Sequence, residues 1–440
     1  MDSLEWEFIL ILMFVSLLFL FFSGLPVAFA FLFITMLGAI WFWGGTKGLH
    51  LLIFNIRASL SSFSLSPLPM FILMGEIMFL SGLGSNIIGA VDKWMGNVPG
   101  RLSLLAVGAG TLLSFLSGVT IATTAILGST LVPEMEARGY KKEMSLGPIL
   151  GSGGLAMMIP PSGLAVLLAT VGEISIAKLL ISIILPGLLM GLLYGGYIVV
   201  RSILNPSLAP PYHMVSVSFK EKVFIFLRHI LPLGVIVFLV IGLILIGFAT
   251  PSEAAATGAM GSFILAFTNR RLNWEVTKKI LLSTARTTIM IFMIIAGAVT
   301  FGQILAFSGA IRGLIEVTLA LDLNPILVVV LMQVIVLFLG CFLEPGSIIM
   351  ITIPLFMPII HALKLNPVWF GVIMLLNIEM GMTTPPFGLG LFVMRSVAPT
   401  GTTLTDCYKA ALPFLGCDLM IMMLIITFPQ IVLWLPAIMR

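Results

Sequence analysis

The chain has 440 residues, of which 60% are hydrophobic and 9% are charged, with a formal net charge of +4 and a mean hydropathy of +1.19. A soluble domain of this length could not cover so much apolar surface with so few charged side chains, and the basic residues form no stripe that would bind nucleic acid. Many apolar segments are as long as a transmembrane helix, whereas a transmembrane β-barrel would show short alternating segments. The sequence therefore predicts an all-α, polytopic membrane protein.

The first half of the chain, residues 1–200, begins with an acidic segment, whereas a cleavable signal peptide carries positive charge there. We therefore expect the first span to be retained. An apolar segment near 102–137 is interrupted midway at Ser117-Gly118, and a later one near 145–170 contains Pro160-Pro161. The other predicted elements of this half are spans near 8–23, 25–43, 59–82 and 175–200, and an amphipathic arm near 84–98.

The interrupted segment near 102–137 predicts a re-entrant hairpin. Each of its arms, with about 16–18 residues, could only just cross the hydrocarbon core. Arg101 flanks one end of the segment, and Lys141 and Lys142 flank the other. If basic residues mark the cytoplasmic side, both ends lie inside and the tip lies near the middle of the membrane. The alternative, two plain spans, stays open.

A polar linker, residues 201–224, leads into a second half, residues 225–440, that repeats the same order. Three proline landmarks recur with an offset of 225 residues: Pro26 and Pro251, Pro133 and Pro358, and Pro160 and Pro385. Because the landmarks keep their order and spacing, the chain is predicted to contain two repeats. The predicted elements of the second half are spans near 225–249, 252–268, 280–307 and 404–437, an arm near 310–322, a hairpin near 325–363 and a broken span near 367–395.

Both halves carry a Pro-Pro pair inside an apolar segment, at Pro160-Pro161 and Pro385-Pro386. Proline has no N–H to donate, so a helix breaks or unwinds there. Unwound backbone is tolerated at membrane depth only where it is buried in protein or lines a cavity, and two broken spans at corresponding positions indicate a transporter's binding site. With five crossings and one hairpin in each half, the second repeat would be the inverted image of the first.

Backbone carbonyls and side-chain hydroxyls are the most abundant polar groups at these breaks. The ionisable residues within apolar runs are few, and the sequence has no HExxH motif and no carboxylate pair at helical spacing in mid-span, which argues against an intramembrane hydrolase. Freed carbonyls and hydroxyls suit Na⁺, and helix N-termini suit the carboxylate of an anionic substrate. Small residues in spans also serve close helix packing, and that alternative stays open for each single residue.

Five stretches of the chain resemble the large membrane subunit of TRAP transporters, the DctM or SiaM-like family: GSGGLAMMIPPSG, MGMTTPPFG, SGVTIATTAILG, GCFLEP and TPSEAAA. The resemblance covers essentially the full chain. It implies an elevator-type transport subunit, multi-pass in the bacterial inner membrane, of a tripartite importer of carboxylic acids such as C4-dicarboxylates or sialic acids. It further implies Na⁺ as the coupling ion, no cofactor, a periplasmic substrate-binding protein, and a small membrane subunit of about four helices, expected here as a separate chain.

Carried over position by position, the resemblance implies two sodium sites and a region near the substrate. The family usually has Gly at position 156 and Asp at position 344, so the role of the Glu344 carboxylate stays open. The first sodium site would involve Ser114, Ser117, Ala156, Ile159 and Pro161. The second would involve Gly340, Glu344, Gly381, Thr384 and Pro386, and the substrate would lie near Thr120, Ser162 and Thr383.

Two other functions stay open from the sequence. A stand-alone Na⁺/carboxylate symporter or ion antiporter of the same architecture would work without partner proteins. A passive channel would show no coupling to sodium.

Overall fold

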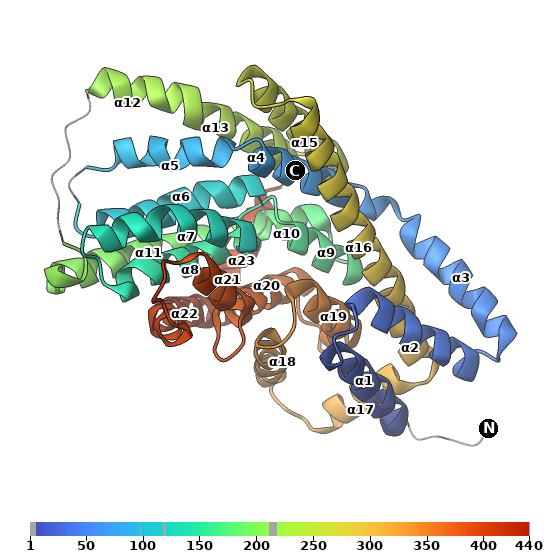
Figure 1. Ribbon diagram of the computed structural model, residues 1–440. Coiled ribbons are helices and arrows are strands. Elements are labelled where there is room, and N and C mark those ends of the chain that lie inside the picture. The colour runs from blue at the N-terminus through green and yellow to red at the C-terminus, as the bar shows by residue number, and fades with distance from the viewer. Residues whose placement is uncertain (1–5, 97, 118–119, 211–217, 440) are drawn as a thin grey trace.

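The computed structural model describes residues 6–96, 98–117, 120–210 and 218–439, and the regular elements within these ranges are all helices. The side chains of residues 85, 86, 116 and 117 are also outside the description. In Figure 1, α5 and α12 lie at one end of the molecule, and α1, α2 and α3 lie at the other. The predicted all-α class is confirmed.

The first helices follow the predicted spans, with one addition. The helix α3 lies between the second and third predicted spans and was not expected from the sequence. Gly44 and Gly45 both have positive φ (87° and 69°), a conformation that glycine adopts without steric cost, and they turn the chain from α2 into α3. The elements are α1 (Trp6–Phe22), α2 (Val27–Phe42), α3 (Thr46–Leu60), the short 3₁₀ turn η1 (Phe63–Leu65), α4 (Pro67–Leu80) and the arm α5 (Leu83–Trp94).

The rest of the first half contains the expected hairpin segment and the first broken span. The second helix of the broken span is bent by 45° from the first. The predicted span near 175–200 is two helices, because Pro186 has no N–H to pair with the carbonyl of Ser182. The elements are α6 (Arg101–Ser117), α7 (Thr120–Ala137), α8 (Lys142–Met158), α9 (Gly163–Val171), α10 (Ile176–Ser182), α11 (Ile184–Leu204) and the 3₁₀ turn η2 (Pro206–Leu208).

The second half begins at Phe219, inside the segment 201–224 that was expected to be a linker, and α11 extends into that segment to Leu204. Its first span is a rod in which two π-helical turns alternate with α-helix. The next helices are α15 (Pro251–Thr268), α16 (Trp274–Phe307) and α17 (Ala310–Ala320). The rod consists of α12 (Phe219–Ile225), η3 (Phe226–Ile230), α13 (Leu231–Val237), η4 (Phe238–Gly242) and α14 (Leu243–Leu245).

The chain ends with the second hairpin segment, the second break and the last span. Here Asn324, Glu344, Asn366 and Thr403 cap the N-termini of four helices, each by accepting a hydrogen bond from a backbone N–H in the first turn. The elements are α18 (Pro325–Gly340), α19 (Pro345–Ala362), α20 (Pro367–Thr383), α21 (Leu389–Val397), α22 (Leu404–Thr427) and α23 (Gln430–Ile438).

Within the described ranges, six helices or helical rods are long and apolar enough to cross a membrane, and α8 with α9 makes a seventh if the bent pair counts as one span. One of the six is α19, the second arm of the expected second hairpin, so the choice between hairpin and two spans is not decided by length. The inverted repeat and its ten crossings remain predictions. The six are η1 with α4, α10 with α11, α12 to α14, α16, α19 and α22.

The two helices that precede the Pro-Pro pairs form the centre of the molecule. From Met144 to Met158 every residue of α8 is buried, and from Val368 to Thr383 every residue of α20 is buried. The two helices pack against each other; α6, α7 and α22 surround α8, and α18, α19 and α22 surround α20. Large apolar side chains of the outer helices are exposed, for example Phe19 and Phe263, as expected for surfaces that face lipid.

Candidate functional site

The first hairpin segment packs closely against α8. A Cβ added to Gly110 of α6 would lie 2.5 Å from the Cβ of Ser152, and a Cβ added to Gly153 would overlap the Oγ1 of Thr124 in α7. Only glycine permits these approaches, so the glycine-rich end of α8 places the hairpin beside the helix that leads into the first break.

The first break lies between Met158 and Gly163, and all of its residues are buried. Ile159 is extended, the Pro160-Pro161 peptide bond is cis, and Ser162 caps α9 by accepting a hydrogen bond from Ala165 N–H at 3.3 Å. An α-helical carbonyl pairs with the N–H four residues later, so Pro160 leaves the carbonyl of Ala156 without that donor. The sequence therefore frees a buried carbonyl at one of the residues expected to bind sodium.

Members of the first predicted set lie on helices that pack together, since Ser114 is in α6 and Ala156 is in α8. Ser114 is fully buried, and its hydroxyl donates to the Gly110 carbonyl at 2.7 Å. Thr120 is buried near Gly153, and among the described residues its hydroxyl has no hydrogen-bond partner. Such an orphaned hydroxyl is a group that a bound cation or substrate would satisfy. The side chain of Ser117, also in the predicted set, lies outside the described residues.

The second hairpin segment contacts the second break through backbone. A Cβ added to Gly340 would lie 2.8 Å from the Cα of Gly381, and one added to Gly381 would lie 2.7 Å from the Cα of Gly340. One residue further along, the Cys341 thiol donates a weak hydrogen bond to the Pro385 carbonyl at 3.6 Å. The end of α18 therefore touches α20 and the Pro-Pro pair directly, as the sequence predicted for Gly340 and Gly381.

The second break runs from the end of α20 at Thr383 to the start of α21 at Leu389, and the Pro385-Pro386 peptide bond is cis. The hydroxyls of Thr383 and Thr384 both donate to the Met380 carbonyl, at 3.2 and 2.7 Å. Their oxygens keep lone pairs that can accept a cation or a donor of the substrate.

Two other members of the second predicted set already have partners in the protein. The Pro386 carbonyl accepts a hydrogen bond from the Tyr408 hydroxyl at 2.6 Å. Glu344 is exposed and caps α19, where its carboxylate accepts hydrogen bonds from the Ser347 N–H and hydroxyl at 2.9 and 2.8 Å. A helix-capping role therefore accounts for the Glu344 carboxylate.

Sequence reasoning missed a buried acidic pair beside the second break. Glu379 of α20 and Asp418 of α22 are both buried and interact electrostatically. The Tyr194 hydroxyl donates to Asp418, whereas both carboxylate oxygens of Glu379 have no hydrogen-bond partner among the described residues. Each acid is the single charged residue in an apolar run, which indicates a buried acid. Nothing in the sequence indicates that Glu379 and Asp418 lie close together.

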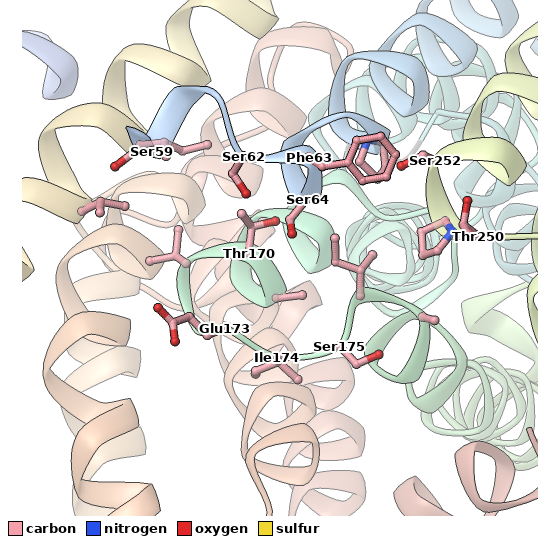
Figure 2. A pocket seen from close by; sticks show the side chains of 18 of the residues that line it. Ser59, Ser62, Phe63, Ser64, Thr170, Glu173, Ile174, Ser175, Thr250 and Ser252 are labelled. Atoms are coloured by element: carbon pink, nitrogen blue, oxygen red, sulfur yellow. The ribbon is translucent and has the colours of Figure 1, made fainter. Parts of the chain in front are cut away.

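A cavity of about 790 Å³ lies apart from the two breaks, where the start of α4 and the start of α15 meet the turn between α9 and α10. Its lining includes seven serine or threonine hydroxyls and one carboxylate, that of Glu173. Figure 2 shows Ser62 and Ser64 of the α3–α4 connection pointing toward Thr170 at the end of α9. This cavity was not expected from the sequence, because its walls come from four segments that lie far apart in the chain.

Comparisons with known proteins agree over nearly the whole chain. The family model described as "Tripartite ATP-independent periplasmic transporter, DctM component" matches residues 14–431. The chain is 34% identical over 377 residues to the C4-dicarboxylate TRAP transporter large permease protein DctM of Pseudomonas aeruginosa, covering 85% of this chain and 86% of that protein. It is 28% identical over 421 residues to the sialic acid TRAP transporter large permease protein SiaM of Vibrio cholerae, covering 95% of this chain and 96% of that protein.

Among solved structures, the fold is similar to the crystal structure of the Alcanivorax borkumensis YdaH transporter, which is described as having an unusual topology. The TM-score is 0.62 at 14% sequence identity, and the match covers 89% of both chains. At this identity the similarity concerns the fold alone.

Proposed function

Since the chain belongs to the DctM family of TRAP transporter large permeases, we propose that it is the transport subunit of a Na⁺-coupled importer of an organic acid. The substrate is a carboxylate, in the class of C4-dicarboxylates and sialic acids that the relatives' names give. A periplasmic binding protein delivers it, a separate small membrane subunit braces the large one, and the complex lies in the bacterial inner membrane.

The observation that carries the proposal is that each hairpin segment packs against the buried helix that leads into a Pro-Pro break. Pro160 and Pro385 occupy equivalent places, since neither can donate to the carbonyl four residues earlier, at Ala156 and at Gly381. The Gly381 carbonyl instead accepts a longer hydrogen bond from Thr384 N–H at 3.3 Å. Carbonyl and hydroxyl oxygens are hard ligands that suit Na⁺. A sodium ion at each break would draw the hairpin end and the broken helix together.

The same geometry supplies a place for the carboxylate. Both α9 and α21 begin directly after a break, so their N-terminal N–H groups and positive dipole ends lie next to the proposed ion sites. Ser162 and Thr383 lie at these two breaks, and Thr120 lies beside Gly153 of α8. Bound Na⁺ and these N-termini would together attract an anionic substrate, which couples its binding to that of the ions.

The packing supports a division into a moving part and a static part. One group of helices, α2, α3, α4, α15 and α16, packs together, and a second group packs around α8 and α20. In the elevator motion that we propose, the second group carries the two breaks and slides against the first. Contacts of α19 with α16 and of α9 with α4 would change during that motion.

Co-reconstitution tests the proposal. Proteoliposomes containing this chain and its small subunit, with the binding protein added outside, are expected to accumulate a carboxylate only when a Na⁺ gradient is present. Uptake by this chain alone would favour a stand-alone symporter or antiporter. Uptake at the same rate with and without a Na⁺ gradient would favour a passive channel. Either result contradicts the tripartite, Na⁺-coupled role.

A further inference from the structure

The arm α5 and the start of the rod lie side by side at one end of the molecule and pack together (Figure 1). The Trp94 indole N–H donates to the Lys222 carbonyl at 3.1 Å, and the centres of the Trp94 and Phe226 rings are 5.8 Å apart. Tryptophan prefers the boundary between membrane and water, so this contact indicates that the end of α5 lies at that boundary. The basic residues around it place it on the cytoplasmic side.

Positive side chains from both elements meet beside this contact. Lys93 of α5 and Arg228 of η3 both interact electrostatically with His229, so the two charges lie on the same part of the surface. Two further lysines lie in α12, at the start of the rod. We call Lys93, Lys220, Lys222 and Arg228 the basic cluster.

Acidic side chains offset only part of the charge of the basic cluster. Glu221 pairs with Lys93 at 3.1 Å, whereas Asp92, which precedes Lys93, pairs with Arg101 at 2.8 Å. Among the residues that the structure describes, no carboxylate lies within ion-pair distance of Arg228 or of the two lysines of α12. Like charges held this close repel one another, so an anion from outside the chain would stabilise the arrangement.

Arg228 lies deeper in the membrane than the lysines of α12. It comes nine residues after Phe219, where the membrane-spanning rod begins, which is about 13 Å further along a helix axis. Its side chain is exposed and lies over the Phe224 ring, with the guanidinium carbon 5.9 Å from the ring centre. A charge on the lipid-facing surface of a span is costly unless an opposite charge is within reach. A long arginine side chain reaches back toward the headgroups, where its guanidinium can form paired hydrogen bonds to a phosphate.

We infer that the basic cluster binds the headgroup of an anionic phospholipid in the cytoplasmic leaflet. The phosphate pairs with Arg228 and Lys93, the lysines of α12 attract it from the water side, and the acyl chains lie against the exposed apolar side chains of the rod, such as Phe224 and Leu227. A zwitterionic lipid carries its own ammonium group, which competes with the protein for the phosphate, so the cluster prefers a lipid with net negative charge.

The bound lipid joins the arm to the rod. The arm α5 leads into the first hairpin segment, so a phosphate held by α5 and η3 together restrains the arm where it leaves the rod. Lipid binding is a property of this chain alone, so the inference stands or falls separately from the proposed transport function.

Equilibrium binding of radiolabelled phosphatidylglycerol and phosphatidylcholine to the purified full-length chain in a neutral detergent tests the site. Phosphatidylglycerol is expected to bind at least about tenfold more tightly than phosphatidylcholine. The double variant Lys93→Gln/Arg228→Gln is expected to weaken phosphatidylglycerol binding about tenfold, because it removes the two charges that pair with the phosphate. Thermal unfolding without added lipid shows whether each variant folds like the unmodified chain.

The matched control is Arg271→Gln/Lys278→Gln, which removes one arginine and one lysine at the turn between α15 and α16. Both side chains are exposed, and neither has an ion-pair partner in the part of the chain that the structure describes. This variant is expected to keep the affinity for phosphatidylglycerol. If it weakens binding as much as Lys93→Gln/Arg228→Gln does, the attraction belongs to the whole basic surface and the inference is wrong.

Glu221→Gln separates a lipid site from a purely structural contact. The substitution breaks the ion pair with Lys93, so a structural role of that pair predicts unchanged or weaker lipid binding. A lipid site predicts binding about threefold tighter or more, because Lys93 no longer pairs with a carboxylate and is free for the phosphate.

Competition with inorganic phosphate, at an ionic strength matched with sodium chloride, distinguishes a lipid from a free anion. Phosphate is expected to displace no more lipid than sodium chloride does, because the acyl chains add apolar contacts that a free anion lacks. Displacement by phosphate beyond that of sodium chloride, equal affinity for the two lipids, or weaker binding by Glu221→Gln would overturn the inference.

Discussion

The Thr384 hydroxyl belongs to the turn where α20 ends, and it donates to the Met380 carbonyl at 2.7 Å. We predict that Thr384→Val, which keeps the shape but removes the oxygen, raises the Na⁺ concentration for half-maximal uptake about tenfold, as loss of one ligand of about 1 kcal/mol or slightly more would. Thr427→Val is the matched control, since Thr427 makes the same kind of bond, to the Met423 carbonyl at 2.8 Å, in the exposed last turn of α22. Identical Na⁺ dependence in the two variants would remove Thr384 from the site.

Gly154 shows how tightly the buried acid is held. A Cβ at this position would overlap the Oε1 of Glu379, so Gly154→Ala is predicted to destabilise the protein by about 1–3 kcal/mol. The control is Gly196→Ala in α11, where a Cβ would meet no atom within 4 Å and the helix should gain about 0.5–1 kcal/mol. Thermal unfolding in detergent measures both changes.

Replacing Glu379 by aspartate shortens the side chain and moves its carboxylate away from α8. Adding Glu379→Asp to Gly154→Ala should therefore recover part of the lost stability. If Gly154→Ala unfolds at the temperature of the unmodified chain, the contact between α8 and the Glu379 carboxylate is wrong.

At the level of residues, the sequence predicted the breaks well and the pairing of acids poorly. The breaks at Pro160 and Pro385 can be predicted from local sequence, because the missing proline N–H leaves a carbonyl only four residues earlier without its helical donor. Glu379, Asp418 and Tyr194 meet only after three helices have packed together. The sequence placed Gly340 opposite Gly381 but could not assign a role to either residue, since glycine serves packing and ion binding alike.

At the level of elements, the contact between α18 and α20 tests whether the hairpin segment stabilises the second break. Gly340→Ala would force the backbone of the two helices apart, since its Cβ would lie 2.8 Å from the Cα of Gly381. We predict a loss of about 1–3 kcal/mol in stability together with weakened Na⁺ activation. Gly416→Ala in α22, where a Cβ would meet no atom within 4 Å, is the control, and equal behaviour of the two variants in unfolding and uptake would contradict the junction.

Most helices could be placed from apolar length alone, and the exceptions have physical causes. The helix α3 has apolar and polar residues mixed, so it looked like a connection between spans. The division at Ile183 depends on Pro186 acting one turn earlier, and the π-helical turns η3 and η4 leave no signature in the pattern of apolar residues. The helix α16 starts at Trp274 rather than near 280, because Asn273 caps it by accepting from Val276 N–H at 2.8 Å.

At the scale of the whole molecule, the inverted repeat makes a prediction about sides of the membrane. Lys141, before α8, and Lys364, before α20, are both exposed and lie at the open ends of the two hairpin segments. With inverted halves, a cysteine at 141 should react with a membrane-impermeant thiol reagent only from the cytoplasmic side, and a cysteine at 364 only from the periplasmic side. The native cysteines Cys341, Cys407 and Cys417 are buried and give a low background. Labelling of both positions from the same side would contradict the inversion.

Sodium coupling is the central claim for the whole molecule, since both breaks are interpreted as cation sites. The most direct measurement is entry of radioactive Na⁺ into proteoliposomes that contain the chain and its small subunit, with and without substrate-loaded binding protein outside. We predict that the loaded binding protein accelerates Na⁺ entry in fixed proportion to substrate uptake, and that Thr384→Val reduces both together. Substrate uptake without any accompanying Na⁺ entry would contradict the account.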